Sequence, residues 1–181
     1  MKSARMGKIL YPPEKVKLIA GLISNDAALL DKIGIRLEKG LKNKIDFESD
    51  IIDFTYTDYY NKEMGGRLKR KFLSFKKLVS LERIAKVKLL TNDIEKRFSI
   101  CGKRTVNIDP GYVDMAKLVL FSTKDYSHRV YMGRGIFAEV TLHYKGKRFN
   151  SWPWTYPDYR SEEYIRIFGI IRDIYRNTKG A

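Results

Sequence analysis

The sequence predicts an α+β fold built on a mostly antiparallel sheet, and three observations support this prediction. Stripes of apolar residues at helical spacing alternate with short runs rich in Ile, Val and aromatic residues. In the second half of the chain, glycine-containing triplets separate segments of alternating polarity, as turns do in hairpins. The chain closes with a long amphipathic stretch that is typical of a surface helix.

The first half of the chain predicts the element order βαββαβ, which is that of a ferredoxin-like half. An extended run is followed by a Ser-Asn-Asp cap and a helix, and two further extended segments lead to a second helix and a strand. The third of these segments also fits a helical stripe through Leu68, Phe72 and Phe75, and we expect a strand there. The first helix is expected after the cap at 24–26, with Leu30, Ile33, Leu37 and Leu41 along one face. The other expected ranges are 15–24 (strand), 46–57 (strand), 67–79 (strand), 80–99 (helix) and 104–108 (strand), the last ending in a turn at Asp109-Pro110-Gly111.

The second half extends this unit by an antiparallel β-meander and a C-terminal helix. Residues 118–123 predict a strand, and residues 129–132 and 136–144 predict a hairpin across Gly133-Arg134-Gly135. A further turn is expected at Lys145-Gly146-Lys147. The final helix begins at the cap residue Ser161, with acidic residues in its first turn and basic residues near its end.

Length and composition predict one α+β domain over residues 14–181, preceded by a basic N-terminal arm over residues 1–13. The single cysteine, Cys101, excludes an intrachain disulfide and an iron–sulfur cluster, and favours a reducing, cytoplasmic compartment. No haem or dinucleotide signature is present. The apolar runs are too short to cross a bilayer, so no membrane partner is expected.

The net charge of +15 is concentrated in residues 62–104, which hold 14 basic and 4 acidic residues. Its densest part, residues 67–77, interleaves basic and aromatic side chains, as in surfaces that bind RNA, DNA or a phosphorylated small molecule. The candidate ligand-binding residues in this stretch are Arg67, Lys69, Arg70 and Lys71. A solvated face of a lysine-rich protein gives the same pattern.

Residues 105–160 hold 11 of the 23 aromatic residues of the chain, which is more than a folding core alone requires. Aromatic residues alternate there with polar groups, and this alternation indicates a binding site. Tyr126 and Trp154 are candidate ligand-binding residues because their rings can stack on a ligand.

Acid–base candidates lie in the same stretch. Asp125 precedes His128 by three residues, and a carboxylate at that spacing can orient an imidazole. Both residues also have structural interpretations, a turn closed by Asp125 and a merely hydrogen-bonded His128. The candidate anion-binding residues nearby are Lys124, Arg129 and Arg160, and the candidate ligands of a divalent metal are Asp109 and Glu139.

Several long motifs resemble domain of unknown function family 4416, a group of uncharacterised prokaryotic proteins, some of which are labelled GTP-binding. The motifs occur in the family's order: TDYYNKEMG (57–65), RKFLSF (70–75), KLLTNDIE (88–95), VNIDPGY (106–112), TKDYSHRVYMGRGIFAEVTL (123–142) and WTYPDYR (154–160). The resemblance implies no catalytic residues. The chain has no GxxxxGK[ST] motif, and residues 102–105 lack the upstream sequence of a P-loop.

Three functional hypotheses follow. The first is binding of nucleic acid or another phosphate-bearing ligand through a basic face beside an aromatic-rich site. The second is a small enzyme that acts on a phosphorylated or nucleotide-like substrate, with Asp125 and His128 as acid and base. The third is a protein-interaction domain in which residues 152–159 contact a protein partner. Charge and aromatic content together favour the first.

Overall fold

The computed structural model describes residues 14–180, so the expected basic arm over residues 1–13 lies outside the described residues. Within this range, nine strands form one sheet in the order β2-β4-β1-β5-β6-β8-β7, with β3 paired to β4 and β9 paired to β8. Every strand pair is antiparallel. The chain therefore has the α+β fold that its sequence predicts.

The first half of the chain forms the predicted βαββαβ unit. Its spatial strand order, β2-β4-β1-β5, is that of a ferredoxin-like half. The expected extended segment over residues 46–57 splits into two short strands, and the segment that fits either pattern is a strand, β4. The elements are β1 (Lys17–Ser24), α1 (Ala27–Leu41), β2 (Ile45–Glu48), β3 (Ile52–Asp53), α2 (Asn61–Met64), β4 (Lys69–Phe75), α3 (Ile84–Arg97) and β5 (Asn107–Val113).

The second half continues the sheet beyond β5. The hairpin predicted across residues 133–135 is confirmed, because Val130 and Tyr131 pair with Ala138 and Phe137. The C-terminal helix is confirmed as well, and the Ser161 hydroxyl accepts a hydrogen bond from the backbone N–H of Tyr164. The elements are β6 (Lys117–Ser122), β7 (Val130–Tyr131), β8 (Phe137–Lys145), β9 (Arg148–Ser151), a short 3-10 helix η2 (Asp158–Arg160) and α4 (Glu162–Gly180).

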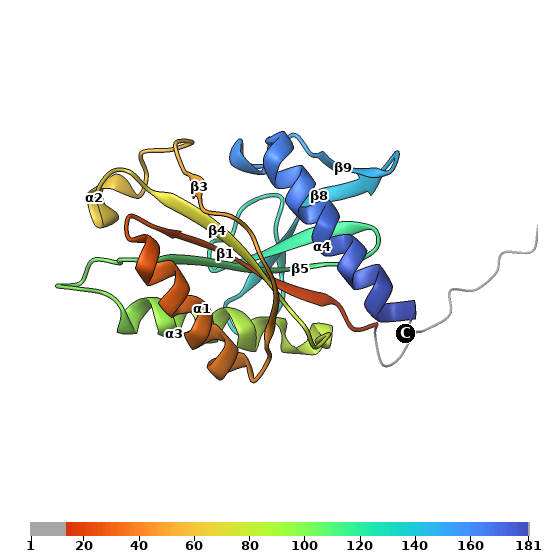
Figure 1. The fold of residues 1–181 in the computed structure, drawn as a ribbon, viewed down its shortest axis with the longest axis horizontal. Coiled ribbons are helices and arrows are strands. Elements are labelled where there is room, and N and C mark those ends of the chain that lie inside the picture. Colours follow the sequence, from red (N-terminus) through yellow and green to blue (C-terminus); the bar gives the residue numbers. More distant parts are fainter. Residues whose placement is uncertain (1–13, 181) are drawn as a thin grey trace, which may run out of the picture.

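Helices cover both faces of the sheet. Figure 1 shows α1 and α3 side by side on one face, with α4 crossing the other. Two of the three hydrophobic clusters among residues 14–180 lie beneath these helices, one beneath α1 and α3 and one beneath α4, where Phe72 of β4 meets Tyr164 and Phe168. The interior strand β4 is buried on both faces and therefore lacks the polar–apolar alternation of a half-exposed strand.

The predicted turn at Asp109-Pro110-Gly111 is wrong, because all three residues belong to β5 and pair with β1. A proline disrupts a sheet only where its missing N–H would have bonded to a neighbouring strand. Pro110 pairs with β1 on one side and has no strand partner on the other, so the sheet tolerates it. Gly111 serves close packing rather than a turn. A Cβ atom at this position would lie 2.3 Å from the Val119 carbonyl oxygen of β6.

Candidate functional site

A cavity of about 550 Å³, here called the cleft, lies where strands β5 and β6 part. The two strands pair only from Gly111 to Val113 on β5 and from Leu118 to Leu120 on β6. Beyond these residues β5 pairs with β1 and β6 pairs with β8, so a gap opens within the sheet. The gap admits side chains from both faces, and the charged residues that line it are Arg70, Lys88, Glu95, Arg104, Asp109, Lys124, Arg129, Glu139 and Asp158.

Side chains of α3 replace the missing strand partner of β5. The backbone N–H of Ile108 donates to Oε1 of Glu95 at 2.5 Å, and its carbonyl oxygen accepts from Nζ of Lys88 at 3.1 Å. Backbone groups of alternate strand residues point to the same side, so Pro110 occupies the next position facing the gap and has no N–H to satisfy. The free edge of β5 is thereby satisfied without a neighbouring strand.

Arg70 forms the wall of the cleft on the side of α4. Its Nη1 donates to Asp109 at 3.0 Å and its Nη2 to Asp158 at 2.9 Å, while the residue itself is 1% exposed. The guanidinium group also faces aromatic rings, including that of Tyr159 at 5.4 Å. Gly21 of the neighbouring strand leaves room for it, since a Cβ atom there would lie 2.9 Å from Nη1.

Asp158 is a buried carboxyl group that shares one guanidinium with a second carboxylate. Burial raises the pKa of the Asp158 carboxyl above its usual value, against the opposing effect of Arg70. Burial likewise raises the pKa of the Glu95 carboxyl. The cleft thus contains two carboxyl groups that hold a proton more readily than exposed ones.

A second ion-pair cluster is centred on Glu139 of β8. Its Oε2 accepts from Nε of Arg129 at 2.8 Å and lies 3.0 Å from Nε2 of His128, and its Oε1 accepts from Thr141 at 3.2 Å. The carboxylate that contacts His128 is therefore Glu139. Asp125, which was expected to orient this imidazole, is exposed and makes no hydrogen bond to it among the described residues.

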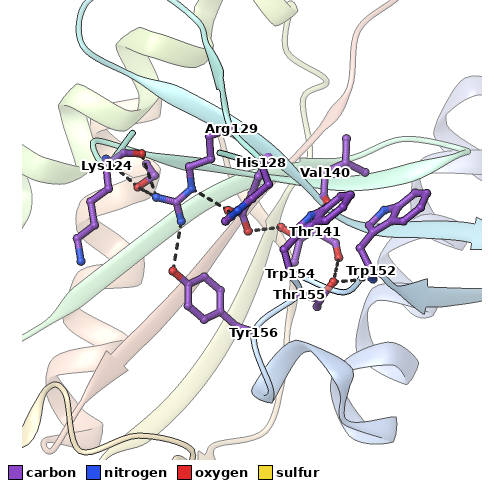
Figure 2. Close-up of polar contacts among 11 residues, drawn as sticks. Lys124, His128, Arg129, Val140, Thr141, Trp152, Trp154, Thr155 and Tyr156 are labelled. Atoms are coloured by element: carbon purple, nitrogen blue, oxygen red, sulfur yellow. Dashed lines mark hydrogen bonds and ion pairs between the residues drawn. The ribbon is translucent and has the colours of Figure 1, made fainter. Parts of the chain in front are cut away.

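Every nitrogen of the Arg129 guanidinium group has a partner within the protein. Besides Glu139, it donates to the Ser122 hydroxyl at 2.8 Å, to the Lys124 carbonyl oxygen at 3.0 Å and to the Tyr156 hydroxyl at 3.3 Å. Figure 2 shows the side chain reaching from Lys124 to Tyr156. Arg129 therefore holds the β6–β7 loop against the segment after β9, and its role as an anion-binding residue stays a prediction.

The aromatic residues of the predicted site form a column beside the cleft. His128 stacks on Trp154, and Trp154 stacks on Trp152 with centroids 5.2 Å apart (Figure 2). Trp152 in turn contacts His143. Trp154 also donates to the Val140 carbonyl oxygen at 3.1 Å. Tyr126 lines the cleft and lies under the guanidinium group of Arg129 at 4.5 Å.

Arg160 does not line the cleft. Its guanidinium group donates to the carbonyl oxygens of Thr155 at 2.7 Å and Pro153 at 2.9 Å. These bonds fold the segment that carries the two tryptophans. Of the three candidate anion-binding residues near His128, Lys124 and Arg129 reach the cleft.

The middle of the basic stretch over residues 67–77 forms β4, an interior strand of the sheet, and the three basic residues of that strand have carboxylate partners. Lys69 forms an ion pair with Asp53, and Lys71 pairs with Asp31 at 2.7 Å and with Glu48. Arg70 points into the cleft wall, whereas Arg67 is exposed on the loop that precedes β4, with a φ of 58°.

Asp109 and Glu139, the candidate metal ligands, both line the cleft. Each already accepts from a guanidinium group, Asp109 from Arg70 and Glu139 from Arg129. Among residues 14–180, no group of three or more His, Cys, Asp or Glu side chains is arranged to hold a metal ion.

Sequence reasoning missed the contributions of Lys88, Glu95 and Arg104. A signal for the first two was present, because both fall within the apolar stripe of α3, four and eleven residues after Ile84. Charged side chains on the buried face of a helix have partners in the interior or line a cavity. Arg104 carried no such signal, and it reaches the cleft while it pairs with Glu63 at 2.7 Å.

Comparison with known proteins places the chain in a family. No curated protein and no solved structure matches it. Within the described residues, no helix is both long enough and apolar enough to cross a membrane. A family profile described as "Domain of unknown function (DUF4416)" matches residues 14–175, nearly the whole chain and all of the elements that form the cleft, and we conclude that the protein belongs to this family.

Proposed function

We propose that this protein binds a small phosphate-bearing ligand of nucleotide size in the cleft between β5 and β6. The observation that carries the proposal is the cleft itself, a cavity of about 550 Å³ lined by tyrosines and by charged groups from both faces of the sheet. Cavities of roughly 300–1,000 Å³ with a few convergent polar groups are typical of small-molecule sites.

The tyrosines of the cleft support a ligand with a planar group. Tyr56, Tyr59 and Tyr60 come from the segment between β3 and α2, whereas Tyr126 and Tyr156 come from the segments after β6 and β9. Tyrosine rings pack against a planar group with their faces and keep a hydroxyl for hydrogen bonding. A nucleobase has the size and shape for this environment.

The charges of the cleft favour a small ligand over a polymer. Five basic and four acidic residues line it, so the net charge is only slightly positive. Polymer binding draws on many unpaired cations along an open surface, whereas Lys69 and Lys71 of the basic stretch are paired with carboxylates. Binding of RNA or DNA is the alternative, and the first experiment must distinguish it from binding of a small ligand.

Catalysis on the same ligand is a second candidate function. Asp158, whose pKa is raised by burial, lines the cleft, and perturbed carboxyl groups in a cavity are frequent in active sites. His128 is the other acid–base candidate, held by Glu139 at 3.0 Å, whereas Asp125 lies outside this pair. The lone cysteine, Cys101, supports a cytoplasmic setting for either function.

The test is calorimetric titration of the nuclease-treated protein with nucleoside monophosphates and triphosphates, GTP included, and with single-stranded RNA and duplex DNA. We expect saturable binding of a nucleotide with weak salt dependence. Tyr156→Ala, in the cleft wall, should weaken it, and Tyr131→Ala, also exposed but outside the cleft, should not. Tight binding of a polymer that weakens steeply from about 50 to 200 mM salt, with no nucleotide binding, would overturn the proposal.

A further inference from the structure

Three of the five cations that line the cleft have carboxylate partners. Arg70 pairs with Asp109 and Asp158, Arg104 with Glu63, and Arg129 with Glu139. Lys88 and Lys124 have no such partner within 4.0 Å among residues 14–180. These two lysines therefore carry the positive charge that is available to a ligand.

Lys88 is the buried member of the two. It is 7% exposed, and its ammonium group makes one hydrogen bond, to the Ile108 carbonyl oxygen at 3.1 Å. An ammonium group has three donors, so two remain. A buried charge without a directly contacting counter-ion is costly to maintain, and a bound anion removes that cost.

The neighbours of Lys88 on α3 complete an anion site. Asn92 lies one turn further along the helix and lines the cleft, and its side chain makes no hydrogen bond within the described residues. Glu95, one turn beyond, accepts from the Ile108 N–H; burial raises the pKa of its carboxyl and the charge of Lys88 opposes that rise without a direct ion pair. An amide donor and an ammonium group thus face the same cavity from one helix.

Lys124 differs in setting. It lies exposed at the rim, with Nζ 3.3 Å from the Tyr59 hydroxyl and 4.8 Å from the centre of the Tyr59 ring. An exposed cation is screened by solvent and contributes less to affinity than a buried one. We therefore expect Lys88 to contribute more to ligand affinity than Lys124.

We infer that Lys88 and Asn92 form the anion subsite of the cleft and that this subsite takes the phosphate monoester group of the ligand. The inference rests on the proposed function, since it assigns one end of the same ligand. The planar part of the bound ligand then lies toward the tyrosines. Lys124, at the rim, attracts the anionic ligand as it approaches the cleft.

The experiment titrates the protein with inorganic phosphate, a nucleoside and its 5′-monophosphate. In the wild-type protein the monophosphate should bind more tightly than the nucleoside, and phosphate alone should bind weakly. Lys88→Met should weaken monophosphate binding about tenfold or more, the effect of losing a charge-assisted hydrogen bond, and should change nucleoside binding less than about twofold. Lys88→Arg should retain most of the affinity.

Lys86→Met is the matched control, because Lys86 lies on the same helix, is exposed and does not line the cleft. Thermal unfolding of each variant shows whether it folds. Should Lys88→Met fail to fold, Asn92→Leu replaces it, and the Lys88 Cε resonance of the wild-type protein is followed as phosphate is added. A shift of that resonance supports the subsite, and its absence at saturating monophosphate overturns it.

The outcomes separate the two proposals. Loss of phosphate and monophosphate binding in Lys88→Met alone supports the subsite. Unchanged monophosphate binding in Lys88→Met overturns the subsite and leaves the cleft proposal standing. Phosphate binding that depends on Lys88, without any nucleotide binding, supports the subsite and overturns a nucleotide-sized ligand. A wild-type protein that binds none of the three overturns both.

Discussion

Arg70 and Asp158 lie 88 residues apart in the sequence, yet Nη2 of the arginine and Oδ2 of the aspartate are 2.9 Å apart in a buried wall of the cleft. The pair joins the interior strand β4 to the short helix η2, which leads into α4. Docking of α4 on the sheet and formation of the cleft wall are therefore coupled. This coupling makes the pair the first target for mutation.

Asp158→Ala should destabilise the fold by about 3 kcal/mol, because it leaves a buried guanidinium group with one of its two carboxylates. Urea-induced unfolding measures the change in the free energy of unfolding. Asp93→Ala is the control, since Asp93 forms an exposed pair with Arg97, and it should cost less than about 0.5 kcal/mol. Equal effects of the two substitutions would contradict a buried, coupled pair.

Glu95→Gln should change how stability depends on pH. Burial raises the pKa of Glu95 in the folded state, so its contribution to stability is fully present below its unfolded pKa, about 4.3, and is lost as the pH rises through the folded value. Glutamine still accepts from the Ile108 N–H and does not titrate. The variant should therefore gain stability relative to wild type between about pH 4 and pH 7. If the free energies of unfolding of variant and wild type differed by the same amount at every pH, a raised pKa of Glu95 would be excluded.

Arg129→Ala should release the β6–β7 loop. The side chain bonds Glu139, Ser122 and Tyr156, and its loss leaves the buried Glu139 carboxylate with fewer donors, at a cost of about 2 kcal/mol. Limited proteolysis should then cut within residues 123–129 faster than in wild type. Arg134→Ala, in the exposed hairpin turn, should leave the cleavage rate unchanged. A resistant loop in Arg129→Ala would show that other contacts hold it.

Gly111→Ala and Gly169→Ala should change the free energy of unfolding in opposite directions. A Cβ atom at Gly111 meets the Val119 carbonyl oxygen at 2.3 Å, so we expect a loss of about 2 kcal/mol or more from forcing β5 and β6 apart. At Gly169, within α4, nothing lies within 4 Å of the added atom, and alanine should stabilise the helix by about 0.5–1 kcal/mol. Thermal unfolding measures the change in stability of both variants. A neutral Gly111→Ala would contradict the close strand approach.

Local patterns predicted most of the fold because the forces behind them are local. The Asp26 cap, the stripe of α1 and the face of α4 all follow from spacing alone, and the structure confirms them. Strand β5 was misjudged because Pro-Gly usually marks a turn. The reason for its presence in a strand, the parting of β5 from β6, lies in contacts between distant segments.

The candidate site was predicted in part. Sequence reasoning selected Glu139, Arg129, Lys124 and Tyr126, which the fold brings together at the cleft. It paired His128 with its sequence neighbour Asp125, whereas the contacting carboxylate comes from β8, eleven residues away. Local spacing cannot specify partners that strand register and tertiary topology bring together.

Backbone amide chemical shifts, mapped as a nucleoside monophosphate is added, locate the binding site of the ligand directly. If the cleft binds the nucleotide, saturable shifts should be confined to the cleft, at the Ile108 amide of β5, at residues 122–126 after β6 and at residues 156–159 around η2. Shifts confined to the outer faces of α1 and α3, or no shifts at millimolar nucleotide, would contradict the claim that this cleft is the binding site.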